Sequence, residues 1–452
     1  MKRALVLSYH FPPIGGAGAQ KPAKLVARLL DHGWRSTVVT GPGLGTGRWT
    51  PLDDELSGDI PPEVPVHRVP GPEPAPSLGW RGRAERWVGL EPWSGWWIDG
   101  AVRAGRDAAS GGIDLVYTWL APYETTVAAA RLAHELGVPW VADLGDPWAL
   151  DEMVVYPTAL HRRHALAQMR LRLASAAAIV MSTPEAAARL RAAFPELAHI
   201  PVVASGNGFD ARDFAPPVAP RADGAFRIVH TGYLHTALGR RHRHAARLRR
   251  LAGGTVRGVD FLTRSHVYLL EAIERLLDRD PSLGQRIEVH LAGVLSVEDH
   301  DIAERRPFVR THGYLEHKEA VRLMRSADLL FLPMQALPAG MRSMTVPGKT
   351  YEYLASGRRI LAAVPEGDAR DILAEAGNAL IVRPSDVEGM RRAIARQLRR
   401  ARAGHPLATE PRPHVLARYE YGALAAEIAA VFDRVAAPPA VRRTRAVPAP
   451  AH

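Results

Sequence analysis

The stretch Ala4-Leu5-Val6-Leu7-Ser8-Tyr9-His10-Phe11-Pro12-Pro13-Ile14-Gly15-Gly16-Ala17-Gly18-Ala19-Gln20 indicates how the chain folds. It opens with a continuously apolar run, which is typical of a strand buried on both faces of a parallel sheet. The glycines that follow let the backbone approach a ligand, and the helix predicted after them presents free N–H groups to it. The spacing of Gly15, Gly16 and Gly18 differs from the dinucleotide fingerprint, and a turn without a ligand uses glycines equally well. A ligand-binding loop and a structural turn therefore both stay open here.

Apolar runs and helical patterns alternate along the first half of the chain, as in a parallel sheet wrapped by helices. The predicted strands are Ala4–Tyr9, Ser36–Thr40, Val66–Val69, Asp114–Thr118, Trp140–Leu144, Ala178–Ser182 and Pro201–Ala204. The predicted helices are Gln20–His32, Ile98–Ala109, Glu124–Leu136, Leu160–Ala174 and Pro184–Ala193.

The alternation restarts after a break rich in Pro and Ala. The second set of predicted strands is Arg227–Thr231, Ile287–Ala292, Val309–His312, Leu329–Pro333, Ile360–Val364 and Ala379–Val382. The helices predicted between them are His266–Asp278, Lys318–Ser326, Gly348–Ser356, Ala369–Ala376 and Val387–Arg402. We therefore predict an α/β protein with two Rossmann-like, doubly wound parallel-sheet domains that face each other across a cleft.

The predicted domain boundaries follow from the same pattern. Residues 1–210 form the first domain, 211–224 a linker, and 225–403 the second domain. The basic residues 236–264 interrupt the second domain, and we interpret them as a solvated arm or as a surface for a phosphate-rich partner. A C-terminal helical segment is predicted at 404–435, and we expect the low-complexity residues 436–452 to be disordered.

Composition excludes several kinds of chemistry. The 452 residues contain no cysteine, which excludes disulfides, thiolate nucleophiles and Cys-ligated zinc. No apolar run approaches the roughly 20 residues that span a bilayer, and the N-terminus lacks a signal-peptide layout, so we expect a cytoplasmic protein. The net charge of +11 fits nucleic acid, anionic lipid or a phosphorylated substrate, and equally a plain Arg-rich composition. Charge alone does not choose among these.

A second cluster lies at Pro347-Gly348-Lys349-Thr350-Tyr351-Glu352. Pro347 and Gly348 break the chain just before a predicted helix, and Lys349 in its first turn opposes the helix dipole unless an anion offsets the charge. Glu352 lies on the same helical face one turn later. An ammonium group suits a diphosphate and a carboxylate suits the two hydroxyls of a ribose. The alternative is an exposed lysine–glutamate pair of little consequence.

Several short motifs, taken in their joint order, resemble the retaining glycosyltransferases of family 4, which have the GT-B fold. In the first half these motifs are PPIGG at 12–16, PWVADLGDPW at 139–148 and GNGFD at 206–210. In the second half they are HTG at 230–232, HGYL at 312–315 and VPGKTYEYL at 346–354. The resemblance covers most of Lys2–Arg400 and is closest to a bacterial subgroup associated with polysaccharide biosynthesis.

The resemblance implies roles for individual residues. Glu352 matches the second Glu of the family's Glu-x7-Glu motif, which grips the nucleotide ribose, whereas the first Glu falls on Met344 and departs from it. Arg264 is the best match to the family's phosphate-binding arginine. Tyr314 and Leu315 fall where the family holds the base.

These matches and the glycine loops give a predicted site. The predicted catalytic residues are Lys349, Arg264, Glu124 and Asp146, the last two as groups that orient the acceptor. The predicted donor-binding residues are Gly15, Gly16, Gly232, Tyr314, Leu315, Gly348, Lys349 and Glu352. For Asp146, an N-cap before Pro147 is an equal alternative. The resemblance implies no metal, because GT-B enzymes generally dispense with one, and no Asp-x-Asp metal motif precedes a sugar site here. No cofactor is predicted, and the nucleoside-diphosphate sugar is a co-substrate.

Residues 72–97 hold half of the 10 tryptophans in the chain, interleaved with arginines. We predict that Trp80, Trp87 and Trp119 lie on the acceptor side and that the segment contacts the inner face of the membrane when the acceptor is lipid-linked. The expected partners are a nucleotide-sugar donor and a sugar or lipid-linked acceptor, and we expect no nucleic acid. The alternative is that the tryptophans pack inside the protein.

The resulting function is transfer of a sugar from a nucleoside-diphosphate sugar to an acceptor, with retention of configuration. Three rivals stay open. A sugar-nucleotide epimerase shares the fold and needs no acceptor. A nicotinamide oxidoreductase explains the first glycine loop but not the pair Lys349 and Glu352, and a basic nucleic-acid-binding protein explains only the charge.

Overall fold

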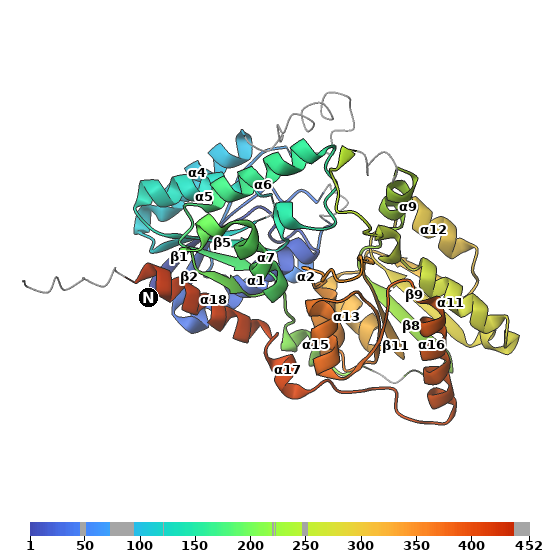
Figure 1. The fold of residues 1–452 in the computed structure, drawn as a ribbon. Coiled ribbons are helices and arrows are strands. Elements are labelled where there is room, and N and C mark those ends of the chain that lie inside the picture. The colour runs from blue at the N-terminus through green and yellow to red at the C-terminus, as the bar shows by residue number, and fades with distance from the viewer. Residues whose placement is uncertain are drawn as a thin grey trace, which may run out of the picture.

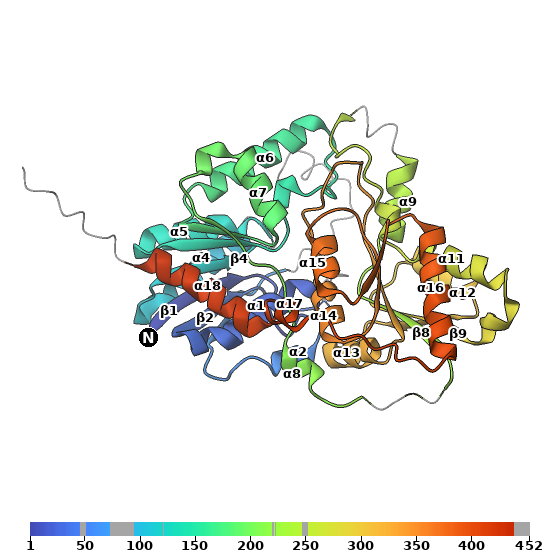
Figure 2. The same ribbon diagram turned by 60° about the horizontal axis from the view of Figure 1, so that its bottom comes forward.

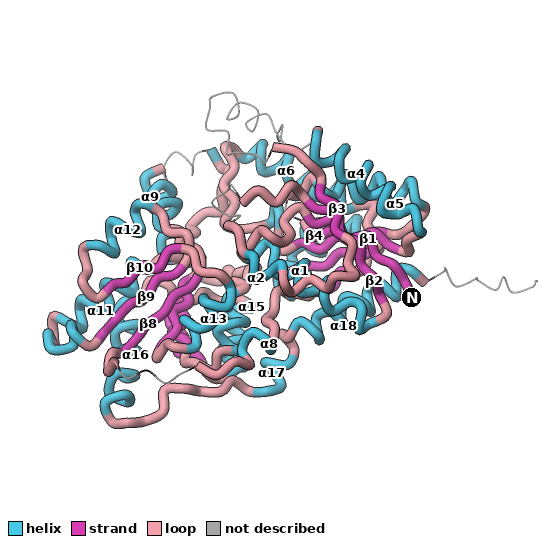
Figure 3. Tube along the Cα trace, turned by 180° about the vertical axis from the view of Figure 1, so that it is seen from behind, coloured by secondary structure: helices cyan, strands magenta, loops and turns pink. Residues whose placement is uncertain are grey.

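The computed structural model describes residues 1–45, 51–72, 95–120, 122–218, 221, 223–245 and 252–437. These form two α/β domains that lie side by side (Figure 1). Each domain is built on a parallel sheet, and the strands of the two sheets are separated by loops and helices in Figure 3. No helix in the described part of the chain is long and apolar enough to cross a bilayer.

The first domain has a seven-stranded sheet within the described residues, in the order β3-β2-β1-β4-β5-β6-β7. Its strands are β1 (Lys2–Ser8), β2 (Trp34–Thr40), β3 (Val66–Arg68), β4 (Leu115–Trp119), β5 (Trp140–Leu144), β6 (Ala178–Met181) and β7 (Val202–Ala204). Along β1, Leu5 and Leu7 face one helical layer and Ala4 and Val6 face the other, as the two-residue period of a strand requires. The first layer contains α4 (Trp96–Ala108), α5 (Thr125–Leu136), α6 (Ala159–Leu173) and α7 (Pro184–Ala193), and the second contains α1 (Ala17–Leu29).

The second domain has a six-stranded sheet within the described residues, in the order β10-β9-β8-β11-β12-β13. Its strands are β8 (Phe226–Thr231), β9 (Ile287–Ala292), β10 (Val309–Gly313), β11 (Leu329–Pro333), β12 (Ile360–Ala363) and β13 (Ala379–Val382). One face packs against α11 (Val267–Leu277) and α16 (Val387–Arg402). The other packs against α13 (His317–Arg325), α14 (Lys349–Ala355), α15 (Asp368–Ala376) and α17 (Pro413–Ala417), and α12 (Val297–Glu304) follows β9.

The last described helix returns to the first domain. Helix α18 (Tyr421–Ala436) begins beside the second domain and lies along α1 of the first domain (Figures 1 and 2). Phe432 packs edge-on against Trp34 with 5.2 Å between the ring centroids, and Asp433 accepts a hydrogen bond from the Trp34 Nε1–H at 3.1 Å. The C-terminal helix therefore completes the core of the N-terminal domain. It ends at Ala436, one residue beyond the predicted segment 404–435.

The segment 236–264 is folded onto the second domain where it is described. Helix α9 (Thr236–His244) is held by a hydrogen bond from Thr236 Oγ1 to Asp299 Oδ1, and Gly239 packs directly on the backbone of Leu262. This packing contradicts the interpretation of the segment as an arm that simply projects into solvent. Trp97 is also buried, and its Nε1–H donates to Thr125 Oγ1 at 3.0 Å, so it belongs to the core.

Candidate functional site

The candidate site lies where the carboxyl ends of the two sheets meet. In each sheet the strand order reverses beside the first strand of that domain, β1 or β8, and ligands of doubly wound proteins bind in the crevice at this point. A first cavity of about 200 Å³ opens here between the domains. Its lining includes Gly16, Gln20 and Asp53 from the first domain, and Gly232, Arg264, Tyr314, Leu315, His317, Gly348, Lys349 and Glu352 from the second.

Lys349 is placed by its contact with a buried histidine. The Lys349 Nζ lies 3.3 Å from His230 Nε2, and His230 Nδ1 lies 3.0 Å from the Phe331 carbonyl oxygen. A carbonyl only accepts, so Nδ1 carries the hydrogen and Nε2 accepts from the ammonium group. Gly232 has a φ of 91°, and a Cβ there would come within 2.9 Å of the Lys349 Nζ. The backbone conformation thus requires glycine at this position, and any larger residue would also displace the Lys349 ammonium group.

Two cations face the first cavity. Burial and the charge of Arg264 lower the pKa of Lys349 to about 7. Burial also lowers the pKa of Arg264, although Asp151 and Asp146 oppose this. The Arg264 guanidinium lies against the sulfur of Met153, at 3.1 Å. Such enclosed like charges are unfavourable until an anion joins them, and a diphosphate supplies that anion.

Glu352 lies beside a histidine that the sequence analysis did not predict. His317 Nδ1 is 3.6 Å from Glu352 Oε1, and His317 Nε2 is 3.0 Å from Asp213 Oδ2. Burial lowers the pKa of His317, but the Asp213 and Glu352 carboxylates outweigh it and the net shift is upward. Burial raises the pKa of Glu352. The His317 ring therefore lies between two carboxylates, Glu352 of the second domain and Asp213 in the segment between the domains.

Asp53 joins the two domains at the mouth of the first cavity. Its Oδ2 accepts hydrogen bonds from the Tyr314 hydroxyl at 3.1 Å and from the His317 backbone N–H at 3.2 Å. Its Oδ1 caps α2 (Asp54–Ser57) by accepting from the Leu56 N–H at 3.1 Å. A side chain at Gly15 would collide with both Asp53 and Tyr314, so glycine is needed for this closure.

A second cavity of about 340 Å³ adjoins the first. The two share Tyr233, Arg264, Pro347 and Gly348, so Arg264 reaches both. The second cavity has many polar side chains in its lining, which also includes His10, Gly15, Asp146, Asp151, Ser182, Asn207 and His235. Burial and the charge of Asp146 raise the pKa of Asp151 to about 7, while the carboxylate accepts from the Met153 N–H at 2.8 Å. A carboxyl group with this pKa is suited to exchange a proton near neutral pH.

The structure brings most of the predicted site residues together. The first cavity contains Lys349, Arg264, Glu352, Gly348, Gly232, Gly16, Tyr314 and Leu315, and the second contains Gly15 and Asp146. Asp146 does not cap the short helix that follows, because that helix has Pro147 at its N-cap position and no side-chain cap.

Two predicted residues line neither cavity. Glu124 lies at the start of α5 and pairs with Arg172 at 3.6 Å. Trp119 is buried, and its Nε1–H donates to the Gly18 carbonyl at 2.8 Å, so it supports the cavity wall from behind. Trp80 and Trp87 lie outside the described residues.

The sequence analysis missed many polar residues that line the cavities, among them Gln20, Asp53, Asp151 and His317. His317 could have been found, because it follows the predicted pair Tyr314 and Leu315 by two positions. Asp53 looks like an ordinary helix cap in the sequence, and that is one of its two roles. Asp151 is part of no local pattern.

Comparisons with known proteins agree with this architecture. Residues 258–400 match the family described as "Glycosyl transferases group 1". No curated protein matches the chain by sequence. Sucrose-phosphate synthase from Thermosynechococcus elongatus has a similar structure, with a TM-score of 0.62 and 16% identity over 96% of this chain and 99% of that one.

Two further solved structures are similar at the level of fold. The α,α-trehalose-phosphate synthase from Burkholderia xenovorans has a TM-score of 0.57 and 15% identity over 97% of this chain and 100% of that one. UDP-GlcNAc 2-epimerase from Neisseria meningitidis, bound to UDP-GlcNAc, has a TM-score of 0.52 and 13% identity over 96% of this chain and 100% of that one. The chain therefore has the GT-B fold, and its second domain carries the match to the group 1 glycosyl transferases.

Proposed function

We propose that the protein is a glycosyltransferase that moves a sugar from a nucleoside-diphosphate sugar to an acceptor hydroxyl. The observation that carries this proposal is the pair of enclosed cations, Lys349 and Arg264, in the cavity between the two sheets. The diphosphate would lie against this pair, and Glu352 would accept hydrogen bonds from the ribose hydroxyls. The family match of residues 258–400 supports the same assignment.

The proposed reaction uses the charge that develops on the leaving group. The bond between the anomeric carbon and the diphosphate oxygen breaks, and the acceptor oxygen bonds to the same carbon. The acceptor attacks the face of the sugar from which the diphosphate departs, so the configuration at the anomeric carbon is retained. On that face the acceptor's proton passes to an oxygen of the departing diphosphate. Lys349 and Arg264 stabilise the negative charge on the diphosphate as it leaves. The reaction as proposed includes no cofactor.

The second cavity is the proposed acceptor site. It meets the first cavity at Arg264 and Gly348, where the sugar of a bound donor would lie. Asp151 and Asp146 offer carboxylates to the acceptor hydroxyls, which fits a sugar or a glycolipid head group. The presence of this second cavity also favours transfer over epimerisation, because an epimerase needs no room for an acceptor.

Ligand stabilisation tests the proposal first. A panel of nucleoside diphosphates and sugar nucleotides is screened by thermal shift, because a ligand that binds only the folded protein raises its melting temperature. The best donor is then incubated with and without candidate sugar acceptors, and nucleoside diphosphate release and epimerised donor are both measured. Acceptor-dependent release supports transfer. Epimerised donor without an acceptor supports the epimerase instead, and no stabilisation by any nucleotide rules out both.

A further inference from the structure

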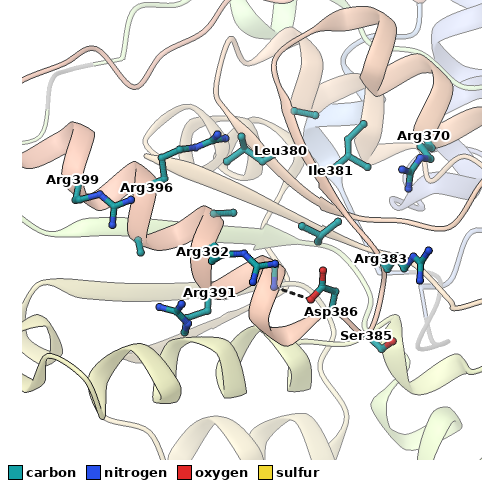
Figure 4. Close-up of a pocket in the computed structure, with 15 residues that line it drawn as sticks. Arg370, Leu380, Ile381, Arg383, Ser385, Asp386, Arg391, Arg392, Arg396 and Arg399 are labelled. Carbon is teal, nitrogen blue, oxygen red and sulfur yellow. Dashed lines mark hydrogen bonds between the residues drawn. The ribbon is translucent and has the colours of Figure 1, made fainter.

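A separate groove runs along the outer edge of the second sheet (Figure 4). It has a volume of about 1090 Å³, and none of its lining residues lines either cavity of the candidate site. Its floor is β13, and its walls come from α15, α16 and the loop between β13 and α16. Six arginines line it: Arg370, Arg383, Arg391, Arg392, Arg396 and Arg399. We name this feature the arginine groove.

The floor of the arginine groove is an unpaired strand edge. β13 is the last strand of its sheet and pairs only with β12 among the described residues. The carbonyls of Asn378 and Val382 accept hydrogen bonds from the β12 side. Hydrogen bonding alternates along a strand, so the N–H and C=O groups of Ala379 and Ile381 point away from β12, along the groove. These groups can accept a further strand.

The charge of the arginine groove is only partly balanced by the protein. Arg391 and Arg392 pair with Glu388, and Arg370 pairs with Glu366. Arg383, Arg396 and Arg399 make no ion pair with any residue that the structure describes, and all three are exposed. The one carboxylate in the lining, Asp386, accepts from the Gly389 N–H at 2.7 Å as the cap of α16. Burial and the like charges of Arg400 and Arg396 lower the pKa of the neighbouring Arg359. An anionic occupant would relieve this repulsion.

We propose that the arginine groove binds an acidic polypeptide segment of another protein, in extended conformation, as an added strand along β13. The unpaired N–H and C=O groups of β13 select a peptide backbone, and the arginines select acidic side chains. Same-face side chains of an extended peptide recur about every 7 Å. Arg392, Arg396 and Arg399 follow one another at about 6 Å and about 4.5 Å along one face of α16, and their long side chains can reach successive carboxylates of such a peptide.

Other occupants fit the groove less well. Residues 438–452 of the chain itself contain three arginines and no Asp or Glu, so their charge repels them from the groove. Pairing with β13 of a second copy of the chain would bring the same arginines against each other. Like charges on an edge strand disfavour such pairing between identical chains. A membrane surface or a polyphosphate would match the charge but would leave the edge of β13 unpaired.

The test uses the full-length protein and a fluorescein-labelled peptide of four Val-Glu repeats, followed by fluorescence anisotropy. The double variant Arg396→Glu/Arg399→Glu should weaken binding at least about tenfold, because both charge pairs become repulsive. The matched control is Arg240→Glu/Arg241→Glu, which makes the same charge change on exposed arginines of α9 and should alter binding by less than about twofold. Both variants should keep the nucleotide-induced thermal shift of the unmodified protein, because the proposed groove is independent of the proposed transfer reaction.

A modified probe tests the strand pairing without changing the protein. The same peptide methylated on alternate backbone nitrogens keeps its charge but cannot pair with β13, and its affinity should fall at least about tenfold. Equal binding of both peptides would overturn the added strand. If Arg240→Glu/Arg241→Glu lost as much peptide affinity as Arg396→Glu/Arg399→Glu, the peptide would be binding to net charge alone, and this would also overturn the proposal. So would a preference for polyphosphate or for phosphatidylglycerol vesicles over the peptide, or no peptide binding at all.

Discussion

Lys349 Nζ lies 3.3 Å from His230 Nε2, and the histidine is fixed in turn by the Phe331 carbonyl. Burial and the charge of Lys349 lower the pKa of His230 well below its usual 6.5, so the ring stays neutral and accepts from the lysine. A neutral acceptor orients the ammonium group without neutralising it. The protonated form of Lys349 therefore keeps its positive charge for interaction with a bound anion.

Lys349→Met should reduce kcat by at least about tenfold, because the leaving diphosphate loses about 1.4 kcal/mol or more of stabilisation. The measurement is steady-state turnover with the donor identified by thermal shift. Lys318→Met, on an exposed lysine at the start of α13, is the matched control and should keep turnover within about twofold. Turnover within about twofold for Lys349→Met as well would remove Lys349 from the mechanism.

Diphosphate binding at pH 8 should draw a proton from the buffer. The pKa of Lys349 is about 7 in the free protein, so at pH 8 its amine is mostly neutral. A bound diphosphate raises that pKa, and uptake should approach about one proton per site. Isothermal titration in two buffers of different ionisation enthalpy measures it. Lys349→Met should take up no proton, and equal uptake by the two proteins would assign the proton to another group.

Glu352→Gln should weaken nucleoside diphosphate binding by about tenfold or more, because a hydrogen bond to a charged group contributes about 1.5–3 kcal/mol. Isothermal titration at pH 7.5 gives the affinity. The control is Glu319→Gln, on an exposed glutamate of α13, which should leave the affinity unchanged. The unmodified protein should bind a 2′-deoxynucleoside diphosphate more weakly than the ribose form, whereas Glu352→Gln should bind the two equally. The opposite pattern contradicts the ribose assignment.

Tyr314→Phe should loosen the closure of the two domains, because it removes the hydrogen bond to Asp53 at 3.1 Å. Small-angle X-ray scattering should show a larger radius of gyration than for the unmodified protein, and the donor KM should rise. Asp53→Ala also removes the cap of α2, so it should lower the free energy of unfolding by at least about 1.5 kcal/mol. Asp54→Ala, on the exposed neighbour, is the control. An unchanged radius in both test variants would show that other contacts hold the domains together.

His317 should make stability depend on pH near neutrality. Its pKa is raised above the usual 6.5 by Asp213 and Glu352 despite burial, so its stabilising contribution is complete below pH 6.5 and is lost as pH rises through the folded-state pKa. Urea unfolding at pH 6 and pH 8 should show that His317→Gln costs more at pH 6. An equal cost at the two pH values would mean that His317 contributes through packing and neutral hydrogen bonds.

The sequence alone determined the two sheets and most of their boundaries. The predicted strands Ile287–Ala292, Leu329–Pro333 and Ala379–Val382 coincide with β9, β11 and β13, and the predicted helix Val387–Arg402 coincides with α16. Strands buried on both faces need unbroken apolar runs, and these are visible in any window of the chain. The cluster from Gly348 to Glu352 was visible for a similar reason, because its residues are neighbours in sequence.

Only the tertiary structure decided which distant residues complete the site. Asp53 and Tyr314 are 261 positions apart, and Lys349 and His230 are 119 apart. Helix α18 closes the first domain from the far end of the chain, with Asp433 against Trp34. A hydrogen bond acts over about 3 Å and involves one atom pair, so it leaves no periodic pattern in the sequence. Periodicity reports which face of an element is buried, whereas the residues that meet across a cleft are set by how two finished domains pack.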